Sequence, residues 1–247
     1  MNAGLLEFLV CPECKAEFLF ACTEADGAEI LSGQLTCEAC QAEYPILRGV
    51  PRFITGEKPL YGKQAETAEA FGWEWKRFPS LHGLSTYEEQ FKNWIHPIEP
   101  EAFRDRVVLD AGCGMGRFSL VSARFGARAV LAVDASEAVE VAYRNLKDAA
   151  NAHVIQADIR KLPLRCGDLA EVELIFTIGV LHHLDNPKAG FAALARHLRS
   201  DGTIFAWVYG RENNGWIVHL VDPLRTIITS RLPRWLLYWA SWVITCL

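Results

Sequence analysis

Residues 107–118 read VVLDAGCGMGRF, and this stretch decides the fold. A short run of β-branched residues ends in Asp110, glycines then alternate at Gly112, Gly114 and Gly116, and a helix-compatible segment follows at once. Such a turn needs glycine because a Cβ would block the approach of a ligand or forbid a positive φ. The pattern therefore predicts a strand, a tight turn and a helix N-terminus whose backbone N–H groups face a nucleotide-like ligand.

The spacing of these glycines separates two classes of ligand. A dinucleotide-binding turn carries G-x-G-x-x-G, whereas this turn carries G-x-G-x-G with Asp110 two residues ahead of it. This difference in spacing weakens the interpretation of the turn as a pyrophosphate-binding one. An NAD-dependent dehydrogenase is therefore a distant alternative.

The D-x-G-x-G-x-G pattern resembles the first motif of the class I S-adenosylmethionine-dependent methyltransferases. The resemblance implies that Asp110, Gly112, Gly114 and Gly116 bind S-adenosylmethionine, with Asp110 beside its ammonium group. This cofactor carries no phosphate, so the acid is compatible with it.

Downstream of the glycines, apolar strand patterns alternate with helical ones. Strands are expected at 106–110, 129–133, 153–155, 172–178 and 203–209, and helices near 117–126, 136–150 and 187–199. This alternation predicts right-handed βαβ units, and hence a Rossmann-like, doubly wound, mostly parallel α/β sheet. Ligands of such sheets bind beyond the carboxyl ends of the strands.

Two further acids stand at those strand ends. Asp134 closes the second strand, where a carboxylate can accept both ribose hydroxyls, and it matches the ribose-binding acid of the methyltransferase family. Asp158 follows the third strand and matches the family's acceptor for the adenine amino group. The predicted cofactor site includes their neighbours Ala135 and Ile159. The alternatives are a helix N-cap for Asp134 and a merely solvated carboxylate for Asp158.

The fourth strand runs into the sequence VLHHL at 180–184. This element resembles one in the methyltransferases that include ubiquinone and menaquinone biosynthesis enzymes. It predicts that His182 or His183 acts as a general base toward the acceptor. One histidine would alternatively only cap a helix or pack on the cofactor, because alignment and exclusion of water suffice for many such transfers.

Four of the eight cysteines form two C-x-x-C pairs, Cys11 with Cys14 and Cys37 with Cys40. Such pairs predict a tetrahedral, closed structural Zn²⁺ site in a reducing compartment, with a redox pair as the alternative. Residues 5–54 resemble the small zinc-ribbon proteins that bind and activate methyltransferase subunits. The resemblance implies a stabilising or docking module fused in cis.

The chain is thus expected to comprise a zinc ribbon (1–56), a linker with an aromatic helical cap (57–105), a cofactor-binding core (106–210) and an apolar helical segment (211–247). The cap helix, expected at 64–78, either packs on the core or forms a lid over the substrate. The last segment either caps the substrate site or meets a membrane surface. The family's final antiparallel hairpin has no counterpart here, so either the helices replace it or the chain is a fragment.

Charge and composition are the basis for the expected partners. The net charge is −5, and residues 1–60 hold four Lys/Arg against nine Asp/Glu, which disfavours nucleic acid. With the aromatic cap, this predicts a cytoplasmic enzyme that methylates an oxygen, carbon or nitrogen of a small, partly apolar molecule. The alternatives are an RNA or protein methyltransferase that uses the ribbon for recognition, and a truncated, non-catalytic scaffold.

Overall fold

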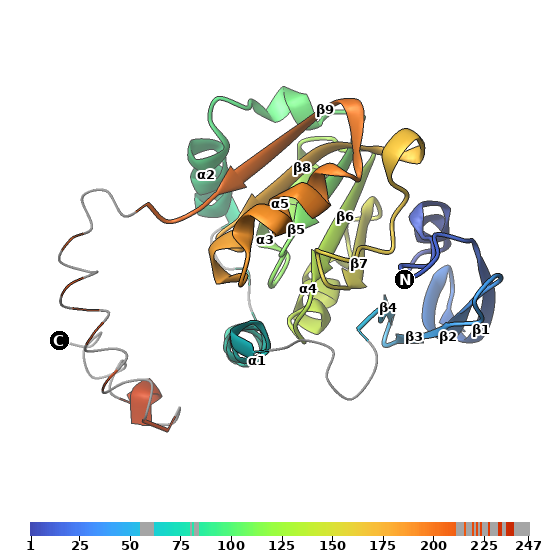
Figure 1. Cartoon of the computed structure of the whole chain (residues 1–247), viewed down its shortest axis with the longest axis horizontal. Coiled ribbons are helices and arrows are strands. Elements are labelled where there is room, and N and C mark those ends of the chain that lie inside the picture. Colours follow the sequence, from blue (N-terminus) through green and yellow to red (C-terminus); the bar gives the residue numbers. More distant parts are fainter. Residues whose placement is uncertain are drawn as a thin grey trace. The chain divides into compact units, whose positions relative to one another are not determined.

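The computed structural model describes residues 1–54, 62–79, 81 and 84–210, and isolated positions between 215 and 239. Residues Met1–Val208 form one compact unit and Tyr209–Leu247 another (Figure 1). The helical segment expected at 211–247 lies mostly outside the described residues. Within the described part of the chain, no helix is long and apolar enough to cross a membrane.

The first unit contains a ribbon, a helical connection and a core. The ribbon comprises η1 (Ala3–Phe8), β1 (Phe18–Asp26), β2 (Glu29–Cys37), β3 (Glu43–Leu47) and β4 (Val50–Pro51). The connection comprises α1 (Gly62–Arg77), α2 (Leu84–Ile95) and η2 (Pro100–Phe103). The core comprises β5 (Val107–Ala111), α3 (Arg117–Arg124), β6 (Ala129–Asp134), α4 (Val139–Leu146), β7 (Ala152–Gln156), η3 (Gly167–Leu169), β8 (Val172–Ile178), η4 (Leu181–His183), α5 (Pro187–Ala195) and β9 (Leu198–Trp207).

The core sheet is parallel throughout and has the strand order β7-β6-β5-β8-β9. This arrangement confirms the predicted Rossmann-like, doubly wound fold. The expected strands agree with β5 to β8 within one residue at each end, but β9 begins at Leu198 rather than at 203. The expected helix at 187–199 was too long, because α5 ends at Ala195 and Leu198 already pairs with Val172.

One face of the sheet is covered by α2, α3 and α4. Phe91 of α2 lies at the centre of an aromatic cluster: its ring stacks 5.0 Å from that of Phe118 and meets Phe176 edge-on at 5.1 Å. The apolar pattern of α2 did not stand out among the prolines and glycines of 79–106, so this helix was missed from sequence. Aromatic contacts of this kind fix α2 on the sheet.

The opposite face is covered by α5 and by the ribbon. The crossover from β7 to β8 (157–171) contains only the short η3 turn and no α-helix. Leu5 and Leu9 of the ribbon are fully buried and share one hydrophobic cluster with Leu131 and Ile155 of the sheet. The ribbon therefore supplies apolar cover that a crossover helix would otherwise provide.

The ribbon also covers an edge of the sheet. Arg52 forms a parallel bridge with Gln156 at the end of β7, and Phe53 N donates to Gln156 O at 2.8 Å. In the crossover that follows β7, Val10 N donates to Pro163 O at 2.9 Å. Figure 1 shows the ribbon, in blue, on the β7 side of the core. This cover satisfies backbone groups that an open edge strand would leave unpaired.

Because ribbon and sheet share one hydrophobic cluster, they should unfold together. Leu9→Ala removes a side chain with 0% exposure and should lower the free energy of unfolding by about 2–5 kcal/mol. Urea denaturation followed by circular dichroism should show one transition, moved to lower urea. The matched control is Leu19→Ala, at a leucine that is 58% exposed, and it should change little. Two separate transitions would contradict the shared core.

Candidate functional site

The glycine turn follows β5 and lies against the element that follows β8. Gly112 and Gly116 have φ of 91° and 82°, which L side chains rarely adopt. A Cβ on Gly112 would lie 2.2 Å from Val180 Cγ2, so the turn and the VLHHL element are in close contact. Gly112 N and Cys113 N both donate to Val133 O, at 2.8 and 2.9 Å, which ties the turn to β6.

Asp134, at the end of β6, is bound to the glycine turn. Its Oδ2 accepts from Gly114 N at 2.9 Å, and its Oδ1 accepts from Ser136 N at 2.8 Å and Ser136 Oγ at 2.7 Å. These bonds hold the turn after β6 against the glycine turn. The N-cap of α4 is Ala138, without a side-chain cap, so the alternative that Asp134 is a helix N-cap is wrong. Oδ1 thereby uses both of its lone pairs, whereas Oδ2 keeps one that can accept from a ribose hydroxyl. That binding role stays a prediction.

Asp110 is the most deeply buried acid of the site. It is 3% exposed and accepts from Ser119 Oγ at 2.6 Å. Burial raises the pKa of its carboxyl to about 7, the main cause being desolvation of the charged form. A cation placed beside it would favour ionisation, so the group fits the ammonium end of S-adenosylmethionine.

The third acid, Asp158, forms a bidentate ion pair. Arg160 Nη2 donates to Asp158 Oδ2 at 2.6 Å and Arg160 Nε donates to Oδ1 at 3.0 Å. The backbone Arg160 N also donates to Oδ1, at 2.8 Å. Its neighbour Ile159 is buried, 5% exposed. The fold thus brings the predicted cofactor residues of three strand ends to the carboxyl edge of β5, β6 and β7. The adenine-binding roles of Asp158 and Ile159 stay predictions.

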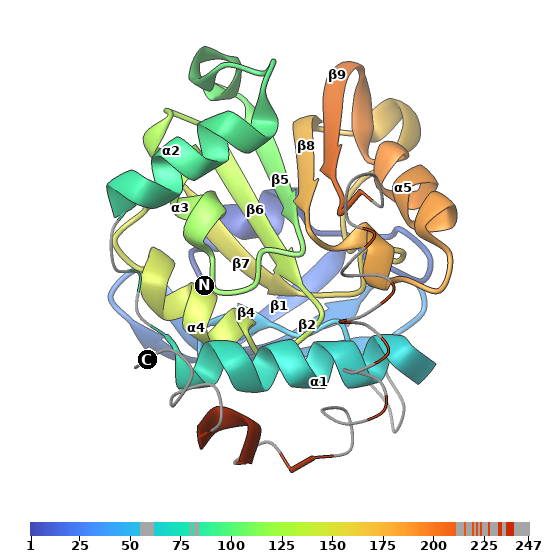
Figure 2. The same ribbon diagram turned by 90° about the vertical axis from the view of Figure 1, so that its left-hand side faces the viewer.

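Helix α1 packs on two parts of this carboxyl edge: the loops after β5 and β6, and the η4 turn after β8. A Cβ on Gly114 would lie 3.1 Å from Trp75 Nε1, and Lys76 Nζ lies 3.6 Å from Glu137 Oε2 in the loop after β6. At the other side, the ring of Phe71 meets that of His183 edge-on at 5.3 Å. Figure 2 shows α1 running across the end of the sheet. The expected helix is present, and it packs on the cofactor loops.

The two predicted catalytic histidines lie in η4. Their rings are 4.1 Å apart, and His183 N donates to Val180 O at 2.9 Å. Partial burial lowers the pKa of His182 through desolvation, so its imidazole is neutral and able to accept a proton near pH 7. The contact of Val180 with Gly112 places η4 beside the glycine turn. The general-base role stays a prediction.

The four ribbon cysteines converge. All four Sγ atoms lie within 4.8 Å of one another, with Cys11–Cys40 at 3.6 Å and Cys14–Cys37 at 3.4 Å. A tetrahedral Zn²⁺ with Zn–S bonds of about 2.3 Å has S–S edges of about 3.8 Å, so the cluster fits this ion. Cys40 N also donates to Cys37 Sγ at 3.4 Å. Four thiolates would leave no open position, so the site is structural.

Sequence reasoning missed a buried link from the ribbon to the cofactor loop. Arg52 is 5% exposed, and it donates to Gln156 Oε1 at 3.0 Å and to Glu140 Oε1 at 3.2 Å. Gln156 Nε2 in turn donates to Ala135 O and Ser136 O, each at 3.3 Å. The ribbon therefore reaches the loop that follows Asp134. Only docking brings these residues together, so no local sequence signal marks them.

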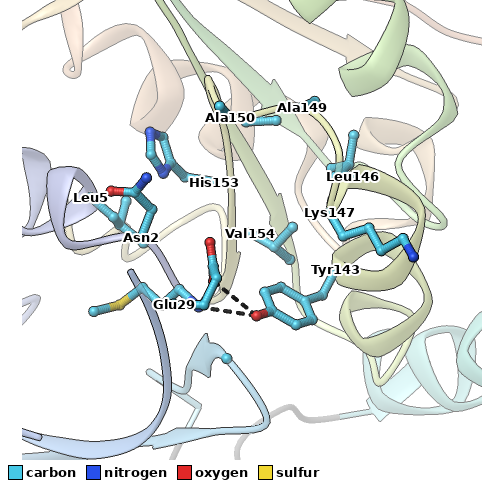
Figure 3. A pocket seen from close by; sticks show the side chains of 13 residues that line it. Asn2, Leu5, Glu29, Tyr143, Leu146, Lys147, Ala149, Ala150, His153 and Val154 are labelled. Atoms are coloured by element: carbon cyan, nitrogen blue, oxygen red, sulfur yellow. Dashed lines mark hydrogen bonds and ion pairs between the residues drawn. The ribbon is translucent and has the colours of Figure 1, made fainter. Parts of the chain in front are cut away.

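A small pocket lies where the ribbon meets α4 and β7 (Figure 3). Tyr143 Oη donates to Glu29 Oε2 at 2.9 Å across it, and burial lowers the pKa of His153 in its wall. Its volume of about 70 Å³ suits a few water molecules and is too small for a nucleoside. It contains none of the predicted site residues.

Comparison with known proteins supports both parts of the unit. Residues 108–202 match a family described as "Methyltransferase domain", and residues 3–49 match one described as "Trm112p-like protein". The chain therefore carries a class I S-adenosylmethionine-dependent methyltransferase domain joined to a Trm112-like zinc ribbon. The predicted enzyme class, and S-adenosylmethionine and Zn²⁺ as cofactors, are confirmed at the level of these domains.

Among curated relatives, the tRNA U34 carboxymethyltransferase of Shewanella pealeana is 28% identical over 176 residues, which cover 61% of this chain and 52% of the relative. That of Pseudoalteromonas translucida is 29% identical over 139 residues, which cover 53% and 41%. The chain thus spans about half the length of the curated relatives it matches. The solved YcgJ structure from Bacillus subtilis is 23% identical, with a TM-score of 0.46 over 57% of this chain and 59% of that one.

The predicted partners are wrong. The sequence favoured a small-molecule acceptor and disfavoured nucleic acid, whereas the curated relatives are tRNA-modifying enzymes by name. The inference failed because a net charge of −5 sums over the whole chain and is dominated by the acidic residues of 1–60. Binding of a polyanion depends on where the cations are gathered. The likeness of VLHHL to quinone-methylating enzymes stays a prediction.

The raised pKa of Asp110 predicts pH-dependent binding of the cofactor. The affinity for S-adenosylmethionine should rise as the pH increases through about 7, because the ionised carboxyl then pairs with the ammonium. Asp110→Asn keeps the bond with Ser119 but lacks the charge. Calorimetry should find binding roughly tenfold weaker or more and independent of pH in this range. A parallel pH dependence in both proteins would contradict the assignment.

The raised pKa of Asp110 also makes the free energy of unfolding depend on pH. Without cofactor, Asp110 favours the folded state while protonated, so its stabilising contribution should be lost as the pH rises from about 4 through about 7. Thermal unfolding should show this loss in the parent chain. Asp110→Asn should show a smaller loss over the same range.

Removing the Arg52 side chain should weaken cofactor binding, although Arg52 is not proposed to contact the cofactor. Arg52→Gln leaves Gln156 Oε1 and Glu140 short of a buried partner, which loosens the loop after Asp134. The Kd for S-adenosylmethionine should rise several-fold. The matched control is Arg48→Gln, because Arg48 pairs with the same Glu140 but is 70% exposed. Equal effects of the two substitutions would argue against the link.

Proposed function

We propose that this chain transfers an alkyl group from S-adenosylmethionine, or a related sulfonium, to a base of an RNA, with tRNA as the substrate class and the cytoplasm as the location. Support comes from the methyltransferase domain at 108–202 and from the tRNA-directed names of the curated relatives. The observation that carries the proposal is the contact of Gly112 with Val180. It sets the cofactor turn directly beside the histidine-bearing element.

In this proposal the acids of the carboxyl edge orient the cofactor. Asp110 pairs with its ammonium group, Asp134 accepts from a ribose hydroxyl through Oδ2, and Asp158 accepts from its adenine amino group. Buried carboxylates and glycine N–H groups provide this orientation without the reorganisation that water would require. The cofactor, when bound, supplies an electrophilic carbon on a positively charged sulfur.

The histidine side receives the acceptor. The nucleophilic atom of the base forms a bond to the transferred carbon as the carbon–sulfur bond breaks and sulfur keeps its electron pair. His182 is neutral near pH 7 because its pKa is lowered, so it can take the proton that the acceptor loses. Helix α1, which contacts both Gly114 and His183, keeps water from the reacting atoms.

The ribbon acts as a stabilising module in cis. Cys11, Cys14, Cys37 and Cys40 would hold a Zn²⁺ ion, and the role of this ion is to keep Arg52 and the apolar η1 in place. The ribbon contacts the loop after Asp134 through the bond of Arg52 with Gln156. Under this proposal the ribbon supports cofactor binding and takes no part in the reaction.

A second candidate is transfer of a carboxymethyl group rather than a methyl group. The names of the curated relatives favour it. The donor would then carry a carboxylate on the transferred carbon, and the same bond would break at sulfur. The residues proposed to bind the amino acid, ribose and adenine of the donor would serve both donors equally.

The test uses the zinc-replete full chain with a tRNA pool and either S-adenosylmethionine or its carboxylated analogue. Mass spectrometry of the digested nucleosides should show one base carrying a methyl or a carboxymethyl group. Asp134→Ala should abolish this product, while Asp148→Ala, which changes an acid outside the proposed site, should retain it. Cofactor binding without a product on any RNA would overturn RNA as the substrate. No cofactor binding by the folded chain would overturn the enzyme itself.

A further inference from the structure

Four arginines gather at the amino edge of the core sheet, opposite the cofactor site. Arg106 and Arg128 stand directly before β5 and β6, and Arg128 N donates to Arg106 O at 2.9 Å. Arg124 ends α3, and Asp105 N donates to Gly126 O at 2.9 Å, which brings Arg104 to the same turn. In Figure 2 this edge is at the top, where η2 leads into β5, and α1 lies at the opposite end. We call these residues the arginine patch: Arg104, Arg106, Arg124 and Arg128.

The patch is poorly neutralised. Among the described residues, only Arg128 has a carboxylate within 4.0 Å, that of Glu173 at 3.9 Å. Glu173 is already engaged, because its Oε1 lies 3.3 Å from Arg199 Nη1 and its Oε2 accepts from Val107 N at 3.0 Å. Asp105 and Glu101, whose backbone O accepts from Arg104 N at 3.2 Å, are also near, so four arginines stand against three carboxylates, and one of these, that of Glu173, is shared with Arg199. A chain of net charge −5 thus presents a local excess of positive charge.

Folding does not account for these four cations. Arg104, Arg124 and Arg128 are exposed, so they bury little surface, and Arg106 is half-buried. A cation in the last turn of a helix is favourable, but this explains Arg124 alone. Exposed guanidinium groups close together repel one another, and they suit a ligand with several phosphates, which they bind in a bidentate manner.

The arginine patch is too far from the glycine turn to take part in the reaction. A ligand that contacts both places must therefore be large. β5 has five residues, so the patch lies about 17 Å from the glycine turn along the sheet. A single nucleoside cannot reach both ends. A folded RNA can, because its backbone carries phosphates over tens of ångströms. The ribbon offers no alternative surface, because residues 1–54 hold three Lys/Arg against eight Asp/Glu.

We propose that the arginine patch binds the sugar–phosphate backbone of the RNA whose base is modified at the opposite edge. The proposal rests on the proposed function and deepens it by naming how the RNA is held. The patch supplies affinity that does not depend on sequence, while the carboxyl edge supplies the chemistry. Long RNA should therefore bind far more tightly than a short oligonucleotide that contains the same acceptor base.

The experiment measures binding of tRNA and of a short single-stranded oligonucleotide to the full chain over a range of salt concentrations. Arg104→Glu with Arg124→Glu should weaken tRNA binding at least tenfold and reduce the salt slope by roughly one per lost phosphate contact. Binding of the oligonucleotide and of S-adenosylmethionine should not change. The matched control reverses two exposed cations outside the patch, Arg144→Glu with Arg196→Glu.

The outcomes separate this proposal from the proposed function. If the parent chain modifies RNA and the patch variant binds tRNA like the parent, the patch is wrong and the function stands. Equal losses in the patch variant and in the control also overturn the patch, because net charge alone then explains them. If the parent neither binds nor modifies RNA while it binds S-adenosylmethionine, the RNA-directed function fails, and the patch fails with it.

Discussion

Burial of the ribbon's apolar residues against the sheet is the contact on which the rest of the unit depends. The crossover between β7 and β8 lacks a helix, so the face formed by Leu131 and Ile155 would meet water without Leu5 and Leu9. Burying leucines of this size contributes on the order of 2 kcal/mol each. The same docking pairs Arg52 and Phe53 with the end of β7. The ribbon is therefore an integral layer of the fold.

From this docking a chain of polar contacts runs to the cofactor turn. Arg52 bonds to Gln156, Gln156 bonds to the carbonyl of Ser136, and Ser136 bonds to Asp134, which accepts from Gly114 N. Each member is at least partly buried, where a missing partner costs more than it would at the surface. The docked ribbon is in this way connected to the glycine turn through side chains of the core.

Local patterns in the sequence were enough to predict the fold and to select the residues of the proposed site. These patterns are the glycine spacing after β5, the acids that close β6 and follow β7, and the paired cysteines. Each can be interpreted without knowledge of the tertiary structure. The Arg52–Gln156 link could not be predicted, because the two residues are 104 positions apart and meet only through docking. The excess of arginine near β5 was hidden in the net charge, and α2 was hidden among helix-breaking residues. The substrate class was misjudged because the prediction relied on the net charge of the whole chain, which also concealed these arginines.

Covalent fusion changes how the ribbon's contacts should be judged. Glu13–Lys161 and Glu17–Arg165 are exposed ion pairs at the rim of the docked ribbon, and pairs of this kind contribute little between separate subunits. On one chain the ribbon meets the core at an effective concentration in the millimolar range, so docking becomes a unimolecular equilibrium. Dilution that would dissociate a two-chain assembly leaves this one docked. The interface can therefore retain polar, weakly stabilising contacts that an obligate heterodimer would need to replace with apolar area.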